Sequence, residues 1–128
     1  MAAIRYGYLR QVQPPAPFVN LVLRHPRNGN EMHDIPAQLD TGADRTVMPE
    51  KLVQALGLPR VGRFEIEGLG GAIHVLFSFA VLLRVHDLSF QRLEGIACPD
   101  EEWILLGRDV LNNHRIILDG PQLALEIS

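Results

Sequence analysis

Apolar and polar residues alternate along most of the chain with a period of two, which is the spacing of half-buried β-strands. Segments with this alternation, or short apolar runs of strand length, cover residues 4–8, 18–23, 32–39, 63–75, 77–85, 88–96, 104–106, 116–118 and 123–127. Residues that favour turns stand between them, as in the stretch 25–30, where a proline, asparagines and a glycine predict a hairpin. The pattern therefore predicts an all-β (mainly β) chain.

Two stretches follow the helical period instead. Residues 49–56 place leucine and valine side chains on one helix face, with a proline in the first turn and a glycine directly after the last residue. Both positions suit these residues, because proline needs no hydrogen-bonded N–H in a first turn and glycine readily ends a helix. A second short helix is predicted over residues 108–114.

The proline-rich stretch 14–17 divides a short arm from the rest of the chain. Prolines lack a backbone N–H and favour an extended conformation. We therefore expect an N-terminal arm over residues 1–17 and one domain over residues 18–128, because 128 residues leave no room for two substantial cores. Within that domain, the alternating segment 123–127 is expected to be an edge strand that needs a partner chain to cover its apolar face.

Composition and charge narrow the possible partners. Apolar residues make up 47% of the chain, yet no apolar run approaches the length of a membrane helix, so no membrane partner is expected. The formal net charge is −3 and no basic cluster is present, which argues against a nucleic-acid partner. The N-terminus lacks the apolar segment of a secretory signal, and the single Cys98 cannot form an internal disulfide, so we expect a cytoplasmic protein.

The tripeptide Asp40-Thr41-Gly42 is the strongest candidate for chemistry. It directly follows the apolar end of a predicted strand, and a glycine there lets backbone amides approach the carboxylate and fix its orientation. The alternative is an ordinary turn, since short motifs also occur by chance. Peptide hydrolysis by paired acids needs two carboxylates about 3 Å apart that share a proton. The tripeptide occurs once, so a two-fold homodimer would have to supply the second acid.

Three blocks of sequence carry a resemblance to a known family. In chain order they read LDTGADRTV at residues 39–47, IEGLGGAI at 66–73 and ILLGRDVL at 104–111. In this order and spacing they resemble the retropepsin family of single-domain aspartic proteases. The resemblance implies a closed barrel of the acid-protease fold, with a glycine-tipped flap hairpin, two short helices and one lobe per chain. It also implies an aspartic endopeptidase that works as a homodimer on an extended peptide or protein substrate, without a cofactor or a metal.

The same resemblance assigns roles to individual residues. It implies that Asp40 is the catalytic aspartate, with Thr41 and Gly42 in the catalytic loop and the Thr41 hydroxyl bonding across the dimer. Residues 67–72 would form the flap that closes over the substrate. Asp44 and Arg108 fall where the family places a structural ion pair. The residues expected to bind substrate are Ala43, Asp44, Val47, Gly68, Leu69, Gly70, Trp103 and Leu105.

Other functions fit the sequence less well. The five histidines have no metal-site spacing, the glycine-rich tip lacks the lysine of a phosphate loop, and Cys98 has no obvious activating neighbour. One alternative from a different class remains open. A retropepsin fold that has lost hydrolysis could serve as a dimerisation or peptide-binding module, because fold does not determine function.

Overall fold

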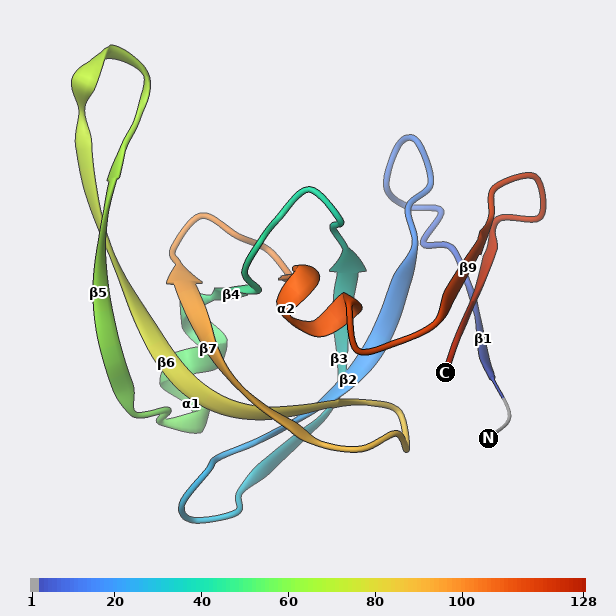
Figure 1. Cartoon of the computed structure of the whole chain (residues 1–128), viewed down its shortest axis with the longest axis horizontal. Helices are drawn as coiled ribbons and strands as arrows, with labels where there is room; N and C mark the ends of the chain where they lie inside the picture. Colours follow the sequence, from blue (N-terminus) through green and yellow to red (C-terminus); the bar gives the residue numbers. More distant parts are fainter. Residues whose placement is uncertain (1–2) are drawn as a thin grey trace.

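The computed structural model describes residues 3–128, apart from the side chain of Ile66. The strands are β1 (Ile4–Gly7), β2 (Phe18–Arg24), β3 (Glu31–Leu39), β4 (Val47–Pro49), β5 (Arg60–Glu67), β6 (Ile73–Val85), β7 (Gln91–Cys98), β8 (Ile104–Leu106), β9 (Ile116–Asp119) and β10 (Ala124–Ile127). Two short helices, α1 (Glu50–Leu56) and α2 (Arg108–Leu111), and one 3₁₀ turn, η1 (Leu69–Gly71), complete the chain (Figure 1). None of the helices is long and apolar enough to cross a membrane.

A seven-stranded sheet closes on itself to form the body of the molecule. Its order is β2-β3-β8-β4-β7-β6-β5, and β2 also pairs with β6, so six of the strands form a ring. β5 stands outside the ring as the second arm of the long β5–β6 hairpin (Figure 1). The all-β fold and the closed barrel predicted from the sequence are therefore confirmed.

The period-two pattern places one face of each strand in the barrel core. In β8, for example, Ile104 and Leu106 are completely buried, whereas Leu105 between them points to the opposite face and is half-buried. The helix α1 covers the core with Val53 and Leu56 and ends at Gly57, whose φ of 64° is left-handed, as glycine allows.

Two predicted elements differ from the structure. The segments 63–75 and 77–85 do not belong to separate hairpins, because residues 73–85 form the single strand β6. No turn residue interrupts it, and it exchanges β5 for β7 and β2 as its partners along its length. The helix predicted over 108–114 ends at Leu111, because Asn113 and His114 close tighter i→i−3 turns.

The chain ends meet in a separate three-stranded sheet of order β1-β10-β9. The prediction that segment 123–127 is an edge strand was wrong, because β10 lies in the centre and pairs on both sides within its own chain. Its apolar residues Leu125 and Ile127 are 1% and 0% exposed and belong to the main core. The expected N-terminal arm supplies β1, whose Ile4 and Tyr6 pack against that core.

This burial predicts that β10 stabilises the single chain. We expect Leu125→Ala to lower the free energy of unfolding by about 2–5 kcal/mol, because it leaves a cavity in a closed core. Chemical denaturation monitored by circular dichroism measures this change. Val61→Ala serves as the control, because Val61 is 54% exposed. Equal effects of the two substitutions would contradict the central position of β10.

Candidate active site

Asp40 begins the loop that joins β3 to β4. Its backbone N–H donates to the Leu106 carbonyl at 2.9 Å and so extends the parallel pairing of β3 with β8 by one residue. The amide of Gly42 donates to the Asp40 carboxylate at Oδ1 (3.1 Å), and the amide of Ala43 donates to the Asp40 carbonyl at 3.1 Å. The loop therefore holds a half-buried carboxylate at the rim of the barrel.

The N-terminus of α2 lies against this loop. The Arg108 amide donates to the Ala43 carbonyl at 2.9 Å, and its guanidinium donates from Nη1 to the Thr41 carbonyl at 2.8 Å. Arg108 therefore holds two residues of the turn that follows Asp40, Thr41 and Ala43, by hydrogen bonds to their carbonyls. The Thr41 hydroxyl makes no hydrogen bond to any other described residue, and its side chain is exposed.

A buried hydrogen-bond network supports the loop from below. Thr46, which is completely buried, donates from its amide to Asp109 Oδ2 (3.0 Å) and from its hydroxyl to Asp109 Oδ1 (2.7 Å). The same hydroxyl accepts a bond from the Gly107 amide at 3.2 Å. No role for Thr46 or Asp109 was predicted from the sequence. Their presence in the first and third sequence blocks was the only signal that could have linked them.

Gly107 permits the close approach of these two segments. A Cβ atom at this position would lie 2.5 Å from the backbone carbon of Arg45, which is closer than real contacts allow. The requirement for glycine here is therefore steric rather than conformational, since its φ of −85° suits any residue.

The candidate substrate-binding residues fall into two groups. Val47 lies beside Leu105 in the barrel sheet, and both side chains are half-buried on the face away from the core. Ala43 and the exposed Asp44 lie in the loop that precedes Val47. Trp103 lies just before β8, where its Nε1 donates to Gln38 Oε1 at 3.2 Å and its ring meets Phe18 edge-on, with centroids 5.1 Å apart.

The glycine-rich tip of the β5–β6 hairpin forms the second group. Figure 1 shows this tip well apart from the loop after β3. Leu69 is fully exposed there, and Gly70 has a φ of 81°, a left-handed conformation that glycine adopts at little cost. Gly68 precedes the turn and accepts a bond from the Gly71 amide at 3.2 Å. In the single chain, the tip therefore does not meet the Asp40 loop.

Asp44 and Arg108 are not joined by an ion pair in the described chain, because the Arg108 guanidinium bonds the Thr41 carbonyl instead. The Asp44–Arg108 ion pair that the resemblance implies is not tested by the single chain and stays a prediction. Arg45 makes a contact that the sequence did not indicate. Its guanidinium lies over the Phe64 ring of β5 at 4.9 Å and 3.8 Å from Glu94 Oε2 of β7, which connects the loop after β3 to both strands.

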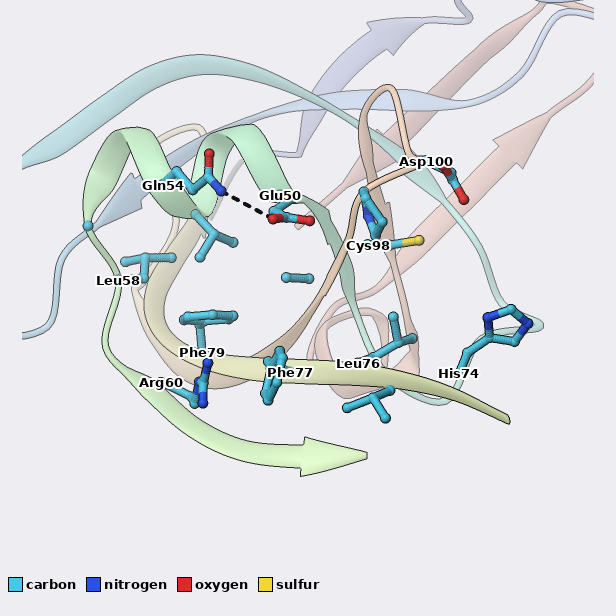
Figure 2. A pocket seen from close by; sticks show the side chains of 15 residues that line it. Glu50, Gln54, Leu58, Arg60, His74, Leu76, Phe77, Phe79, Cys98 and Asp100 are labelled. Carbon is cyan, nitrogen blue, oxygen red and sulfur yellow. Dashed lines mark hydrogen bonds between the residues drawn. The ribbon is translucent and has the colours of Figure 1, made fainter. Parts of the chain in front are cut away.

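A pocket of about 880 Å³ lies elsewhere, between α1, β6 and the end of β7 (Figure 2). Phe77 and Phe79 supply aromatic walls, and Glu50 and Asp100 stand at its rim. Asp40 does not line it, so the pocket is separate from the candidate active site. Among the described residues, no group of three or more histidine, cysteine or acidic side chains could hold a metal ion.

The comparisons with known proteins agree with this geometry. A family model described as "gag-polyprotein putative aspartyl protease" matches residues 28–113, a range that contains the Asp40 loop, the β5–β6 hairpin and α2. The chain belongs to this family. Its family and its fold are those of aspartic proteases, of the retropepsin-like type. No curated protein sequence matches the chain.

Two solved structures show how far the fold is shared. A retropepsin-like aspartic protease from Rickettsia conorii aligns with a TM-score of 0.67 at 17% identity, over 98% of this chain and 89% of its own. The EIAV protease, solved in complex with an inhibitor, aligns with a TM-score of 0.54 at 23% identity, over 77% of this chain and 86% of its own. At these identities the likeness concerns the fold alone.

The buried network yields a prediction for the loop that carries Asp40. Thr46→Val keeps the volume of the side chain but leaves the Gly107 amide and the Asp109 carboxylate short of a partner, which costs about 1–3 kcal/mol of stability. Thr46→Ser keeps the hydroxyl and serves as the control. Denaturant unfolding of both variants measures the difference. If Thr46→Val were as stable as Thr46→Ser, the hydroxyl would not support the loop.

Proposed function

We propose that this protein is an aspartic endopeptidase in which two copies of the chain each contribute Asp40 to one active site. The observation that carries the proposal is the fixed orientation of the Asp40 carboxylate by the Gly42 amide, on a loop that Arg108 and Asp109 brace. Family membership and the three intact sequence blocks support the same assignment.

The chemistry requires one proton shared between the two Asp40 carboxyl groups. The ionised group takes a proton from a water molecule, and the resulting hydroxide attacks the peptide carbonyl carbon while the protonated group donates its proton to the carbonyl oxygen. One hydroxyl group of the tetrahedral intermediate then returns its proton to the second carboxyl group as the carbonyl re-forms and the C–N bond breaks, and the leaving amine takes up the proton held by the first group. The shared proton is restored when the products leave.

The surroundings of Asp40 favour an extended substrate with apolar side chains. Val47 and Leu105 present apolar surface on the same barrel face, and burial of a substrate leucine or phenylalanine against such a wall contributes about 1.5–3 kcal/mol. In the proposed complex, the tip around Leu69 and Gly70 closes over the peptide as a flap. The unbonded Thr41 hydroxyl is then free to brace the loop of the second copy.

Substitution of the catalytic carboxylate tests the proposal. We expect Asp40→Asn to reduce cleavage of a peptide library to background, because it removes the shared proton while keeping the size of the side chain. Asp100→Asn, an exposed acid at the rim of the separate pocket, is the control and should cleave like the wild type. Mass spectrometry of the digests measures both the rate and the preference for side chains at the cut.

The same digests distinguish other outcomes. Chelators should leave cleavage unchanged. Cleavage that persists in Asp40→Asn and stops with a chelator would assign the activity to a metal enzyme instead. A wild-type protein that binds library peptides without cutting them at any pH would favour the alternative of an inactive binding module.

The shared proton also predicts how the rate depends on pH. At low pH both carboxyl groups of the pair are protonated, so no base remains. At high pH both are ionised, so no acid remains. The rate should therefore be bell-shaped, with its maximum at acidic to mildly acidic pH. Initial rates on one cleaved peptide between pH 3 and 9 measure the profile. A flat profile across this range would contradict the shared-proton mechanism.

A further inference from the structure

A carboxylate at the base of the β5–β6 hairpin takes no part in the proposed reaction. Glu94 of β7 accepts a hydrogen bond at Oε1 from the Ser78 hydroxyl of β6 at 2.5 Å, and Ser78 is completely buried. A buried hydroxyl is costly without a partner, so this bond fixes the Glu94 side chain. The second oxygen, Oε2, lies 3.8 Å from Nη1 of Arg45. Glu94 therefore connects the hairpin strand β6 to the loop that carries Asp40.

The outer strand of the hairpin, β5, leaves room for this bond. A Cβ atom at Gly62 would lie 2.9 Å from the Ser78 hydroxyl oxygen and 3.1 Å from Glu94 Oε1, so a larger residue would press on both groups. The pairing of β5 with β6 also shifts its register between Arg60 and Gly62. Residues of β5, β6 and β7 therefore meet at one point at the base of the hairpin.

Arg45 reaches this point from a fixed backbone. Its carbonyl carbon packs so closely against Gly107 that no side chain fits there, and the next residue, Thr46, is completely buried. The guanidinium extends to the hairpin and lies over the Phe64 ring of β5 at 4.9 Å. β5 is the end strand of its sheet and pairs with β6 alone among the described strands (Figure 1). Arg45 thus joins a braced loop to the arm of the hairpin that lies outside the barrel.

We propose that Glu94 is a positioning residue for the flap, because it holds Arg45 over Phe64 and so fixes the β5–β6 hairpin relative to the Asp40 loop. Together, Ser78, Glu94, Arg45 and Phe64 form what we call the hairpin contact. The inference rests on the proposed function, in which the hairpin tip closes over the peptide. Glu94 acts through Arg45 and touches no reacting atom.

The exposure of the hairpin contact determines the size of its effect. The side chains of Arg45 and Glu94 are 43% and 36% exposed, so their ion pair contributes modestly, as does a guanidinium over a partly exposed ring. Such contacts change the population of the closed hairpin without locking it. Substrate affinity falls in proportion to the fraction of chains in the competent state, whereas a saturating peptide still holds the hairpin closed. Loss of the contact should therefore raise KM and leave kcat unchanged.

Substitution of Glu94 tests the hairpin contact. Glu94→Gln keeps a hydrogen-bond acceptor but removes the charge that faces Arg45. KM for one cleaved peptide should rise about twofold to fivefold, whereas kcat and the pH of the rate maximum should not change. Glu65→Gln is the matched control, because Glu65 belongs to the same hairpin and its ion-pair partner, at 3.4 Å, is Arg63 of its own strand. Thermal unfolding of both variants checks that they fold.

A double-mutant cycle tests whether Glu94 acts through Arg45. Arg45→Met keeps an apolar stem for the Phe64 ring but removes the charge, so it should raise KM to a similar extent. Glu94→Gln should then raise KM no further in the Arg45→Met background, because the two substitutions remove one contact. Equal effects of Glu94→Gln in both backgrounds would show that it acts elsewhere and would overturn the hairpin contact.

A distance measurement tests the hairpin without peptidase activity. In a Cys98→Ser background, spin labels at Leu69→Cys on the exposed tip and at the exposed Lys51→Cys on α1 report the position of the hairpin by double electron–electron resonance. An excess of unlabelled chain keeps labelled chains from pairing. Glu94→Gln should broaden the distance distribution, because the hairpin then visits more positions. Glu65→Gln should leave the distribution as in the wild type.

The outcomes separate this inference from the proposed function. If the wild type cleaves peptides but Glu94→Gln leaves either KM or the distance distribution unchanged, the hairpin contact is wrong and the peptidase assignment stands. A lower kcat at unchanged KM also overturns the inference, because Glu94 would then act on the chemistry. If Glu94→Gln broadens the distances and the wild type never cleaves peptides, the hairpin contact stands and the proposed function fails.

Discussion

The hydrogen bonds between Thr46 and Asp109 are the interaction on which the candidate site depends. They join two segments that are far apart in the chain, the loop after β3 and the start of α2, and they do so where Thr46 is fully shielded from water. A buried hydroxyl and a carboxylate that satisfy each other are stable, whereas either alone would be costly. This network therefore favours a single position of the loop, and with it a single position of the Asp40 carboxylate.

The steric requirement for glycine at position 107 also favours a single position of the loop. The backbone of Arg45 approaches so closely that no side chain fits, which lets the Gly107 amide reach the Thr46 hydroxyl. The next residue, Arg108, donates hydrogen bonds to the carbonyls of Thr41 and Ala43, which directly follow Asp40 in the loop. The Asp40 carboxylate is thus positioned by backbone geometry and buried polar contacts, and the apolar core supplies only the barrel that carries them.

The sequence predicted the strands well because alternation reflects which face of each strand is buried. It predicted that Asp40 lies in a loop at the end of a strand, because the residues of a loop are contiguous in the chain. It could not predict that Asp109 supports Thr46, since that contact spans 63 positions and nothing in the local pattern links an acid in a helix to a distant threonine. It also misplaced the free edge, because β9 and β10 are both short apolar segments and only their pairing with β1 decides which one is central.

That misplacement has a physical consequence for how an active site can be shared between chains. A strand whose apolar face is already buried has nothing to gain from a partner, whereas β9 leaves both backbone groups and apolar surface exposed to water. A strand added at such an open edge would gain hydrogen bonds and bury that surface without rearranging this chain, so the cost of ordering would be small. The open edge of β9 and the residues that hold the Asp40 loop occupy one continuous stretch from Gly107 to Asp119. A change that shifts β9 therefore also acts on the residues that hold the Asp40 loop, because no other element separates them along the chain.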